Sequence, residues 1–356
     1  MSAVALILAA GEGTRMKSGL PKVAHEILGV PMVRYVVEAA LAAGCVRVIA
    51  VTGHGSEVVD TLLSDIEVVH QDRQLGTGHA VMCAHDALAG FSGSLVVLSG
   101  DTPLLRAETI AGLIAQRESS ASAVALLTTH LHDPSGYGRI VRDRDGAVAA
   151  IVEQKDLAAD QHHLNEVNTG TYCFDSAVLF AHLDRLSTEN AQGEYYLTDM
   201  VAVFNEEGLL VSALAAEEPL ETLGVNSRVQ LAEATKVMQR RINTRHMLEG
   251  VTMVDPGLVW IGPHVTIGRD VELWPMTFLT GRTVIADGAT VGPNSRVADS
   301  KVAEGARIDS SVLIQAEVGP NATVGPAAYV RPGTVLEAET KVGPGIDIPH
   351  PGSREG

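Results

Sequence analysis

The sequence contains few aromatic residues and no cluster of basic residues. Aromatic residues make up 4% of the 356 residues, whereas 46% are hydrophobic and 35 are glycine. Its cores must therefore be built mainly from aliphatic side chains, and tight turns should be common. The formal net charge is −17, which argues against nucleic acid or an anionic membrane as a partner. A phosphorylated ligand would have to be held by a few local cations and by backbone N–H groups.

Cysteine is scarce, and long apolar runs are missing. Cys45, Cys83 and Cys173 form no C-x-x-C pair, which predicts reduced thiols and a cytoplasmic protein. No apolar run reaches the roughly 20 residues of a membrane span. The apolar start of the chain is interrupted by Gly11 and Glu12, which is typical of a strand and its turn rather than of a signal peptide.

The first part of the chain alternates short apolar strands with amphipathic helices. This alternation predicts an α/β fold with a mostly parallel sheet, whose ligands bind beyond the carboxyl ends of the strands. Strands are expected over residues 4–9, 46–52, 67–70, 95–99, 122–128, 147–152, 168–174 and 209–213, and helices over residues 33–43, 78–89 and 107–117.

A six-residue repeat follows a long polar helix expected over residues 227–248. Aliphatic residues recur every six positions from Ile261 to Val297; the phase then slips and resumes at Val312, continuing to Val342. Many of these hexads open with Ile-Gly or Val-Gly. A fixed six-residue step is the signature of a parallel β-helix with three hexads in each coil, here about five coils. An ordinary β-sandwich, the alternative, does not explain the step.

The opening stretch "LILAAGEGTRMKSGLPK" (residues 6–22) has the character of a phosphate-binding loop. It lacks the G-x-x-x-x-G-K-[ST] spacing of a P-loop, and Met16 stands where a dinucleotide fingerprint requires its third glycine. What remains is a strand, a glycine-rich turn and two cations, Arg15 and Lys22. Glycines let backbone N–H groups approach a phosphate, and the cations supply the charge that a triphosphate requires. A surface turn with solvated cations is the alternative.

The motifs then follow one another in the order of a known family. "LAAGEGTRM" and "LPK" are followed by "QDRQLGTGHA", "SGDTP", "PSGYGRI", "IVEQKD", "EVNTGTY", "NAQGEYYLTD" and "GVNSR", and then by the hexads. The chain resembles the sugar-1-phosphate nucleotidyltransferases and, among them, the bifunctional N-acetylglucosamine-1-phosphate uridyltransferase/glucosamine-1-phosphate acetyltransferase family. The resemblance covers nearly the whole chain, so it depends on an ordered set of motifs rather than on any single one.

The resemblance implies a domain organisation and a reaction. A Rossmann-like nucleotidyltransferase domain would occupy residues 1–226, a linker helix residues 227–250, a short left-handed parallel β-helix residues 251–347 and a tail residues 348–356. The implied reaction joins UTP and N-acetylglucosamine 1-phosphate into UDP-N-acetylglucosamine, a peptidoglycan precursor, and releases pyrophosphate. No covalent enzyme intermediate is needed, so catalysis would be mainly positioning and charge neutralisation.

Asp101 is the candidate ligand for Mg²⁺. It follows the apolar strand "LVVL", at a strand end where an α/β sheet places its chemistry, and a carboxylate suits a hard cation. The alternative is a turn in which Thr102 caps a helix starting at Pro103. The resemblance implies that Asp101 and Asn226 bind the ion together and that Arg15, Lys22 and Asp101 form the catalytic group. From the residues alone, Asn226 reads more readily as a loop or helix-cap residue.

The resemblance also assigns two substrate pockets. The nucleotide would be bound by Leu8, Ala9, Ala10, Gly11, Lys22, Gln71, Gly76 and Thr77. The sugar phosphate would be bound by Ser99, Gly100, Asp101, Gly138, Glu153, Asn168, Thr169 and Asn226, with "EYYLTD" nearby. Ser99 stands where some relatives carry tyrosine, so that contact would be weaker or made by backbone. None of the thirteen histidines has convincing metal-ligand spacing.

The expected β-helix is shorter than in the full-length family. Arg331 in "VRPGTV" matches a phosphate-binding arginine of the acetyltransferase, but no later segment matches that site's histidine, lysines or coenzyme A contacts. We therefore expect no acetyltransferase activity and a homotrimer built through the β-helix. Two alternatives stay open: transfer to another sugar 1-phosphate such as glucose 1-phosphate, and a non-catalytic regulatory subunit.

Overall fold

The structure is a computed structural model that describes residues 2–11, 13–53, 57–344 and 347–348. The chain divides into two compact units. The first consists of Met1–His25 and Pro31–Leu231, and the second consists of Glu26–Val30 and Ala232–Gly356. The residues expected to form a tail lie, from 349 onward, outside the described ones. Within the described part of the chain, no helix has both the length and the apolar character needed to cross a bilayer.

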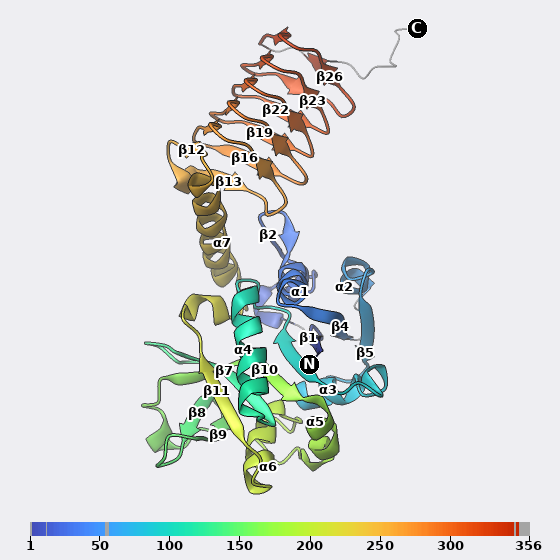
Figure 1. The fold of residues 1–356 in the computed structure, drawn as a ribbon, viewed down its shortest axis with the longest axis vertical. Coiled ribbons are helices and arrows are strands. Elements are labelled where there is room, and N and C mark those ends of the chain that lie inside the picture. The colour runs from blue at the N-terminus through green and yellow to red at the C-terminus, as the bar shows by residue number, and fades with distance from the viewer. Residues whose placement is uncertain (1, 12, 54–56, 345–346, 349–356) are drawn as a thin grey trace. The chain divides into compact units, whose positions relative to one another are not determined.

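A central sheet organises the first unit, and its strands run in the order β11-β7-β10-β6-β1-β4-β5 (Figure 1). Neighbouring strands are parallel, except that β10 runs antiparallel to both β6 and β7. The expected α/β fold is confirmed, with a mixed sheet. The strands are β1 (Ala3–Leu8), β4 (Cys45–Gly53), β5 (Glu67–Gln71), β6 (Ser94–Ser99), β7 (Val124–His130), β10 (Glu166–Asp175) and β11 (Val211–Ala215).

Two short strands extend this sheet beside β10. The sequence predicts β9 (Val148–Val152) but not its partner β8 (Arg139–Arg142). The two strands pair antiparallel, and β8 also pairs with β10. Two very short strands, β2 (Glu26–Ile27) and β3 (Val30–Pro31), form a separate pair near the start of the chain.

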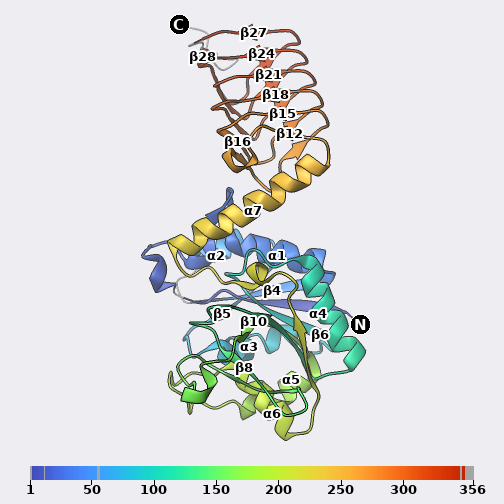
Figure 2. The same cartoon turned by 90° about the vertical axis from the view of Figure 1, so that its left-hand side faces the viewer.

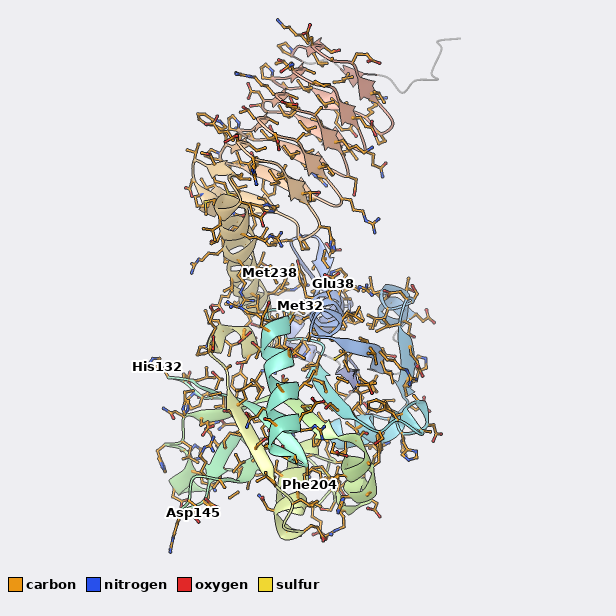
Figure 3. All side chains as sticks on the ribbon, viewed as in Figure 1. Met32, Glu38, His132, Asp145, Phe204 and Met238 are labelled. Carbon is orange, nitrogen blue, oxygen red and sulfur yellow. The ribbon has the colours of Figure 1, made fainter. Side chains whose placement is uncertain are left out.

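Helices cover both faces of the central sheet (Figure 2). On one face, alternate strand residues such as Ile7 and Leu98 pack with α1 (Met32–Ala42) and α4 (Ala107–Ser120). On the other face, the intervening residues pack with α3 (Thr77–Cys83), α5 (Ser176–His182) and α6 (Met200–Glu206). Figure 3 marks Met32 at the start of α1 and the buried Phe204 on α6. A short helix α2 (Glu57–Leu62) follows β4. This two-sided burial explains why the parallel strands read as continuous apolar runs.

The polar helix expected over residues 227–248 is α7 (Arg228–Leu248). Within the second unit its polar side chains satisfy backbone groups at the start of the repeat. Gln239 Nε2 and Asn243 Nδ2 both donate to the Val259 carbonyl, at 2.7 and 2.9 Å. An edge strand exposes unpaired carbonyls, and these two amides satisfy one of them.

The hexads form a left-handed parallel β-helix with three sheets. One sheet joins β12 (Thr252–Met253), β15 (Glu272–Leu273), β18 (Thr290–Val291), β21 (Arg307–Ile308), β24 (Thr323–Val324) and β27 (Lys341–Val342). The second joins β13 (Val259–Ile261), β16 (Thr277–Thr280), β19 (Arg296–Ala298), β22 (Val312–Ile314), β25 (Tyr329–Val330) and β28 (Asp347–Ile348). The third joins β14 (Thr266–Ile267), β17 (Val284–Ile285), β20 (Lys301–Val302), β23 (Glu317–Val318) and β26 (Val335–Leu336).

The slip in the six-residue phase is a local shortening of the coil. Val259 pairs with Thr277, eighteen residues later, whereas Lys301 pairs with Glu317, sixteen residues later. The expectation that the phase resumes at Val312 is wrong by one position, because the buried residue there is Leu313. Turns in this stretch contain residues of positive φ, such as Ser310 (φ 43°). The buried residues Ile308, Leu313 and Val318 therefore follow one another in steps of five.

This one-residue correction can be tested by truncating each side chain. We expect Leu313→Ala to destabilise the β-helix by about 2–4 kcal/mol, because it leaves a cavity in the core. Val312→Ala, the matched control, should cost less than about 1 kcal/mol because Val312 is only half-buried. Urea unfolding of the full chain, followed by far-UV circular dichroism, measures both. Equal losses in the two variants would contradict the register.

Candidate active site

The loop after β1 carries the first part of the site. Gly13 has φ 61°, and a Cβ atom there would collide with the Lys22 Cβ atom. The second glycine of the motif is therefore required both by backbone conformation and by the passage of the Lys22 side chain. Gly11 has nothing within 4 Å of an added Cβ, so the backbone beside it faces open space. This matches the expectation of a loop that a ligand can approach closely.

Asp101 lies immediately beyond β6 and is held from several sides. Ser99 Oγ donates to Asp101 Oδ1 at 2.7 Å, and the Asp101 carbonyl accepts from the Val225 N–H at 2.9 Å. Thr102 Oγ1 donates back to the Ser99 carbonyl at 2.8 Å, and the next helix begins only at Ala107. The alternative in which Thr102 caps a helix starting at Pro103 is therefore wrong. Asp101 is 8% exposed, and the hydrogen bond from Ser99 fixes the orientation of its carboxylate.

Lys22 connects three distant parts of the chain. Its Nζ atom donates to Asp101 Oδ2 and, at 3.0 Å, to Asn226 Oδ1. Gly224 lies against this group: an added Cβ atom would sit 3.4 Å from both Asp101 carboxylate oxygens and from Asn226 Nδ2. One cation is thus shared by a carboxylate and an amide oxygen, in the pairing expected for residues 101 and 226.

Amides and glycines form one end of the pocket. Gln71, at the end of β5, donates from Nε2 to the Gly76 carbonyl at 3.1 Å, and Gln74 Nε2 donates to the Ala10 carbonyl. Gly76 has φ 103°, and an added Cβ would lie 2.5 Å from the Tyr195 carbonyl oxygen. Only glycine allows the two loops to approach so closely.

Glu153 and Asn168 form the opposite end. Thr198 Oγ1 donates to Glu153 Oε1 at 3.4 Å, and Asn168 Nδ2 donates to the Tyr172 hydroxyl at 2.7 Å. Burial raises the pKa of Glu153; the hydrogen bond from Thr198 opposes the rise, and neighbouring acidic side chains add to it. Gly138, the fifth residue of "PSGYGRI", has no side chain, and an added Cβ would lie 3.4 Å from Glu153 Oε1.

These groups line one cavity of about 510 Å³ in the first unit. Its lining includes most of the expected site residues: Leu8, Ala9, Ala10, Gly11, Lys22, Gln71, Gly76, Thr77, Ser99, Asp101, Glu153, Asn168, Thr169 and Asn226. Arg15 is exposed and is not part of the lining. Gly100 lies just behind the lining, where its N–H donates to the Leu8 carbonyl at 2.9 Å. Gly138 likewise lies behind Glu153.

Sequence reasoning did not single out several residues that line the cavity, among them Gln74, Tyr137, Tyr172 and Gly224. Burial raises the pKa of Tyr137, and the charge of Asp101 adds to the rise. All four lie inside motifs that the sequence displays, and Gly224 is the first residue of "GVNSR". The sequence showed only that these residues lie within motifs. A motif does not show which of its residues face the cavity.

Comparison with known proteins agrees with this geometry. Residues 5–199 match the MobA-like NTP transferase domain family. The bifunctional protein GlmU of Trichlorobacter lovleyi is 46% identical over 343 residues, which are 95% of this chain and 75% of that protein. The GlmU of Exiguobacterium sp. is 46% identical over 349 residues, 98% of this chain and 77% of that protein. The GlmU of Heliobacterium modesticaldum is 46% identical over 345 residues.

The chain belongs to the GlmU family. The resemblance drawn from the motifs is confirmed, and with it the activity: the chain is a sugar-1-phosphate uridyltransferase that makes UDP-N-acetylglucosamine. The chain spans about three quarters of these relatives' length, and the β-helix continues as far as β27 and β28. The loss of acetyltransferase activity remains a prediction.

The close approach at Gly76 gives a test of the pocket. We expect Gly76→Ala to weaken UTP binding at least about tenfold, because the methyl group collides with the Tyr195 carbonyl and alanine disfavours the backbone conformation. Gly90→Ala is the matched control: Gly90 also has positive φ, 78°, but an added Cβ meets nothing within 4 Å. Calorimetric titration with UTP compares the two. Tight UTP binding by the Gly76 variant would rule out this end of the pocket as a nucleotide site.

Proposed function

We propose that this cavity carries out the uridylyl transfer with UTP at the Gln71 end and N-acetylglucosamine 1-phosphate at the Glu153 end. An oxygen of the sugar phosphate forms a bond to the α-phosphorus of UTP, the bond to the β-phosphate breaks, and pyrophosphate leaves. The convergence of Lys22, Asp101 and Asn226 between the two ends carries the proposal. It gathers charge and oxygen ligands where the two phosphate groups must meet.

The residues at this point fit Mg²⁺. Asp101 Oδ2 and Asn226 Oδ1 already share one positive charge, the Lys22 ammonium group, which stands in for a cation. Both atoms are hard oxygen donors, and Mg²⁺ commonly takes few protein ligands and completes its shell with water and substrate phosphates. Among the described residues no cluster of three His, Cys, Asp or Glu side chains offers a richer site. When bound, the ion supplies charge that neutralises the triphosphate.

The two cations have separate roles in this proposal. Lys22 is held within the cavity and neutralises phosphate charge close to the point of attack. Arg15 is an exposed residue of the short turn at Thr14–Met16, outside the cavity lining, where its guanidinium group can bind two oxygens of the β- and γ-phosphates. Arg15 would therefore stabilise the leaving pyrophosphate rather than the nucleotide base.

The two ends of the cavity select the substrates. Gln71, Gly76 and Thr77 supply amide and backbone groups that match the polar edge of uracil. Glu153, Asn168 and Thr169 supply groups that hydrogen-bond sugar hydroxyls and the N-acetyl group. The exposed aliphatic residues Val284 and Val335 of the β-helix support trimer formation, and the free cysteines support a cytoplasmic location.

The metal assignment can be tested without relying on turnover alone. Asp101→Asn should lower the rate of pyrophosphate release at least about 100-fold and weaken Mn²⁺ binding, which electron paramagnetic resonance measures directly. Arg15→Ala should lower the rate similarly but leave Mn²⁺ binding unchanged. Asp86→Asn, a fully exposed carboxylate outside the cavity, is the control. Unchanged Mn²⁺ binding in Asp101→Asn would contradict the site.

Glu153 gives the enzyme a specific dependence on pH. Because burial raises its pKa, Glu153 keeps its proton to a higher pH than a free glutamate does. As the pH falls through this raised pKa, the carboxylate is lost and can no longer accept hydrogen bonds from sugar hydroxyls. We expect KM for the sugar phosphate to rise toward acid pH while KM for UTP changes little. Glu153→Gln should have a high KM that no longer varies over this range. A wild-type KM independent of pH would contradict the assignment.

A further inference from the structure

His79 lies behind the base end of the cavity and belongs to none of the groups assigned above. It is in the first turn of α3, and its Nδ1 atom is 2.9 Å from Gln71 Nε2. Its ring stacks on Tyr195, with centroids 6.4 Å apart and an interplanar angle of 26°. One turn later, Cys83 Sγ lies 3.8 Å from Nδ1. The ring is therefore held in place, with one nitrogen directed at Gln71.

The orientation of the Gln71 amide follows from its neighbours. The Gly76 carbonyl oxygen can only accept a hydrogen bond, so the Gln71 atom 3.1 Å from it must be the donor, Nε2. The same nitrogen contacts His79 Nδ1. An amide nitrogen carries two hydrogens, and these two acceptors take one each. Hence His79 Nδ1 is the unprotonated acceptor, and the ring proton of the neutral tautomer is on Nε2.

In this arrangement one polar atom of the Gln71 side chain remains available to a ligand. Gln71 lines the cavity although it is only 3% exposed, and its side-chain hydrogen bonds to Gly76 and His79 both involve Nε2. The remaining polar atom, Oε1, can accept a hydrogen bond from a ligand. Uracil has an N–H donor at N3, whereas cytosine has a lone pair at the same position. An acceptor held at that edge therefore favours uracil and opposes cytosine.

We propose that His79 is a positioning residue for nucleotide selection: it locks the Gln71 amide with its oxygen toward the base and so makes the site prefer UTP over CTP. The inference rests on the proposed function, because it takes Gln71 as the residue that contacts the base. Rotating the amide by half a turn would place Oε1 against both the Gly76 carbonyl and His79 Nδ1. Without His79, only the Gly76 carbonyl opposes that rotation.

The test compares three substitutions at position 79 by calorimetric titration of the full chain with UTP and with CTP. His79→Leu removes the acceptor, and the ratio of the two dissociation constants should shrink roughly three- to tenfold, the equivalent of about one hydrogen bond. His79→Asn keeps an acceptor near the Nδ1 position and should retain the ratio within about twofold. His79→Gln places its amide one bond further out and should behave like the leucine variant.

Controls separate positioning from general damage. KM for the sugar phosphate should not change in any His79 variant, because the opposite end of the cavity is untouched. His85→Leu changes a largely exposed histidine outside the cavity lining and should leave the UTP/CTP ratio unaltered. If the leucine variant fails to fold, the asparagine and glutamine variants still give the comparison.

A Gln71→Ala variant distinguishes failure of this inference from failure of the proposed function. If Gln71→Ala abolishes the preference for UTP while His79→Leu and His79→Gln retain it in full, the base site stands and the positioning role of His79 is wrong. Equal ratios in the asparagine and glutamine variants would also overturn that role. If Gln71→Ala keeps the full preference, the base is read elsewhere, and both assignments fail.

Discussion

The ion pair between Lys22 and Asp101 is the interaction on which the site depends. Leu8 and Ser99, the last residues of β1 and β6, are paired in parallel register, so the loops after them leave the same edge of the sheet side by side. Lys22 lies at the end of the first loop and Asp101 in the second, and Asn226 adds the third contact. Removing either charge would leave the other nearly buried and unpaired, which is costly.

Much of the fold follows from local patterns in the sequence. Continuous apolar runs indicated the buried strands, and the six-residue step indicated the β-helix. The patterns could not give the direction of β10, because a strand has the same side-chain periodicity whether its neighbours run parallel or antiparallel. They also could not choose between Val312 and Leu313, since adjacent aliphatic residues satisfy the repeat equally well until the turn before them is known.

The site was predictable to the extent that its residues lie in motifs. Lys22, Asp101 and Asn226 converge, but no spacing in the sequence shows that Lys22 reaches a residue 204 positions later. The residues that were missed act through tertiary contacts: Gln74 reaches the Ala10 carbonyl, and Gly224 makes room beside Asp101. Arg15 is the opposite case. Its motif predicted a place in the site, but its side chain is exposed and lies outside the cavity lining.

The most direct test of the account is the release of pyrophosphate from UTP and Mg²⁺ by the purified full chain, with N-acetylglucosamine 1-phosphate and glucose 1-phosphate as alternative acceptors. The account predicts release mainly with the N-acetyl sugar, because Glu153 and Asn168 form the sugar end of the cavity. Release mainly with glucose 1-phosphate would contradict that pocket while retaining the phosphate site. No release with either acceptor would contradict the catalytic roles given to Lys22 and Asp101.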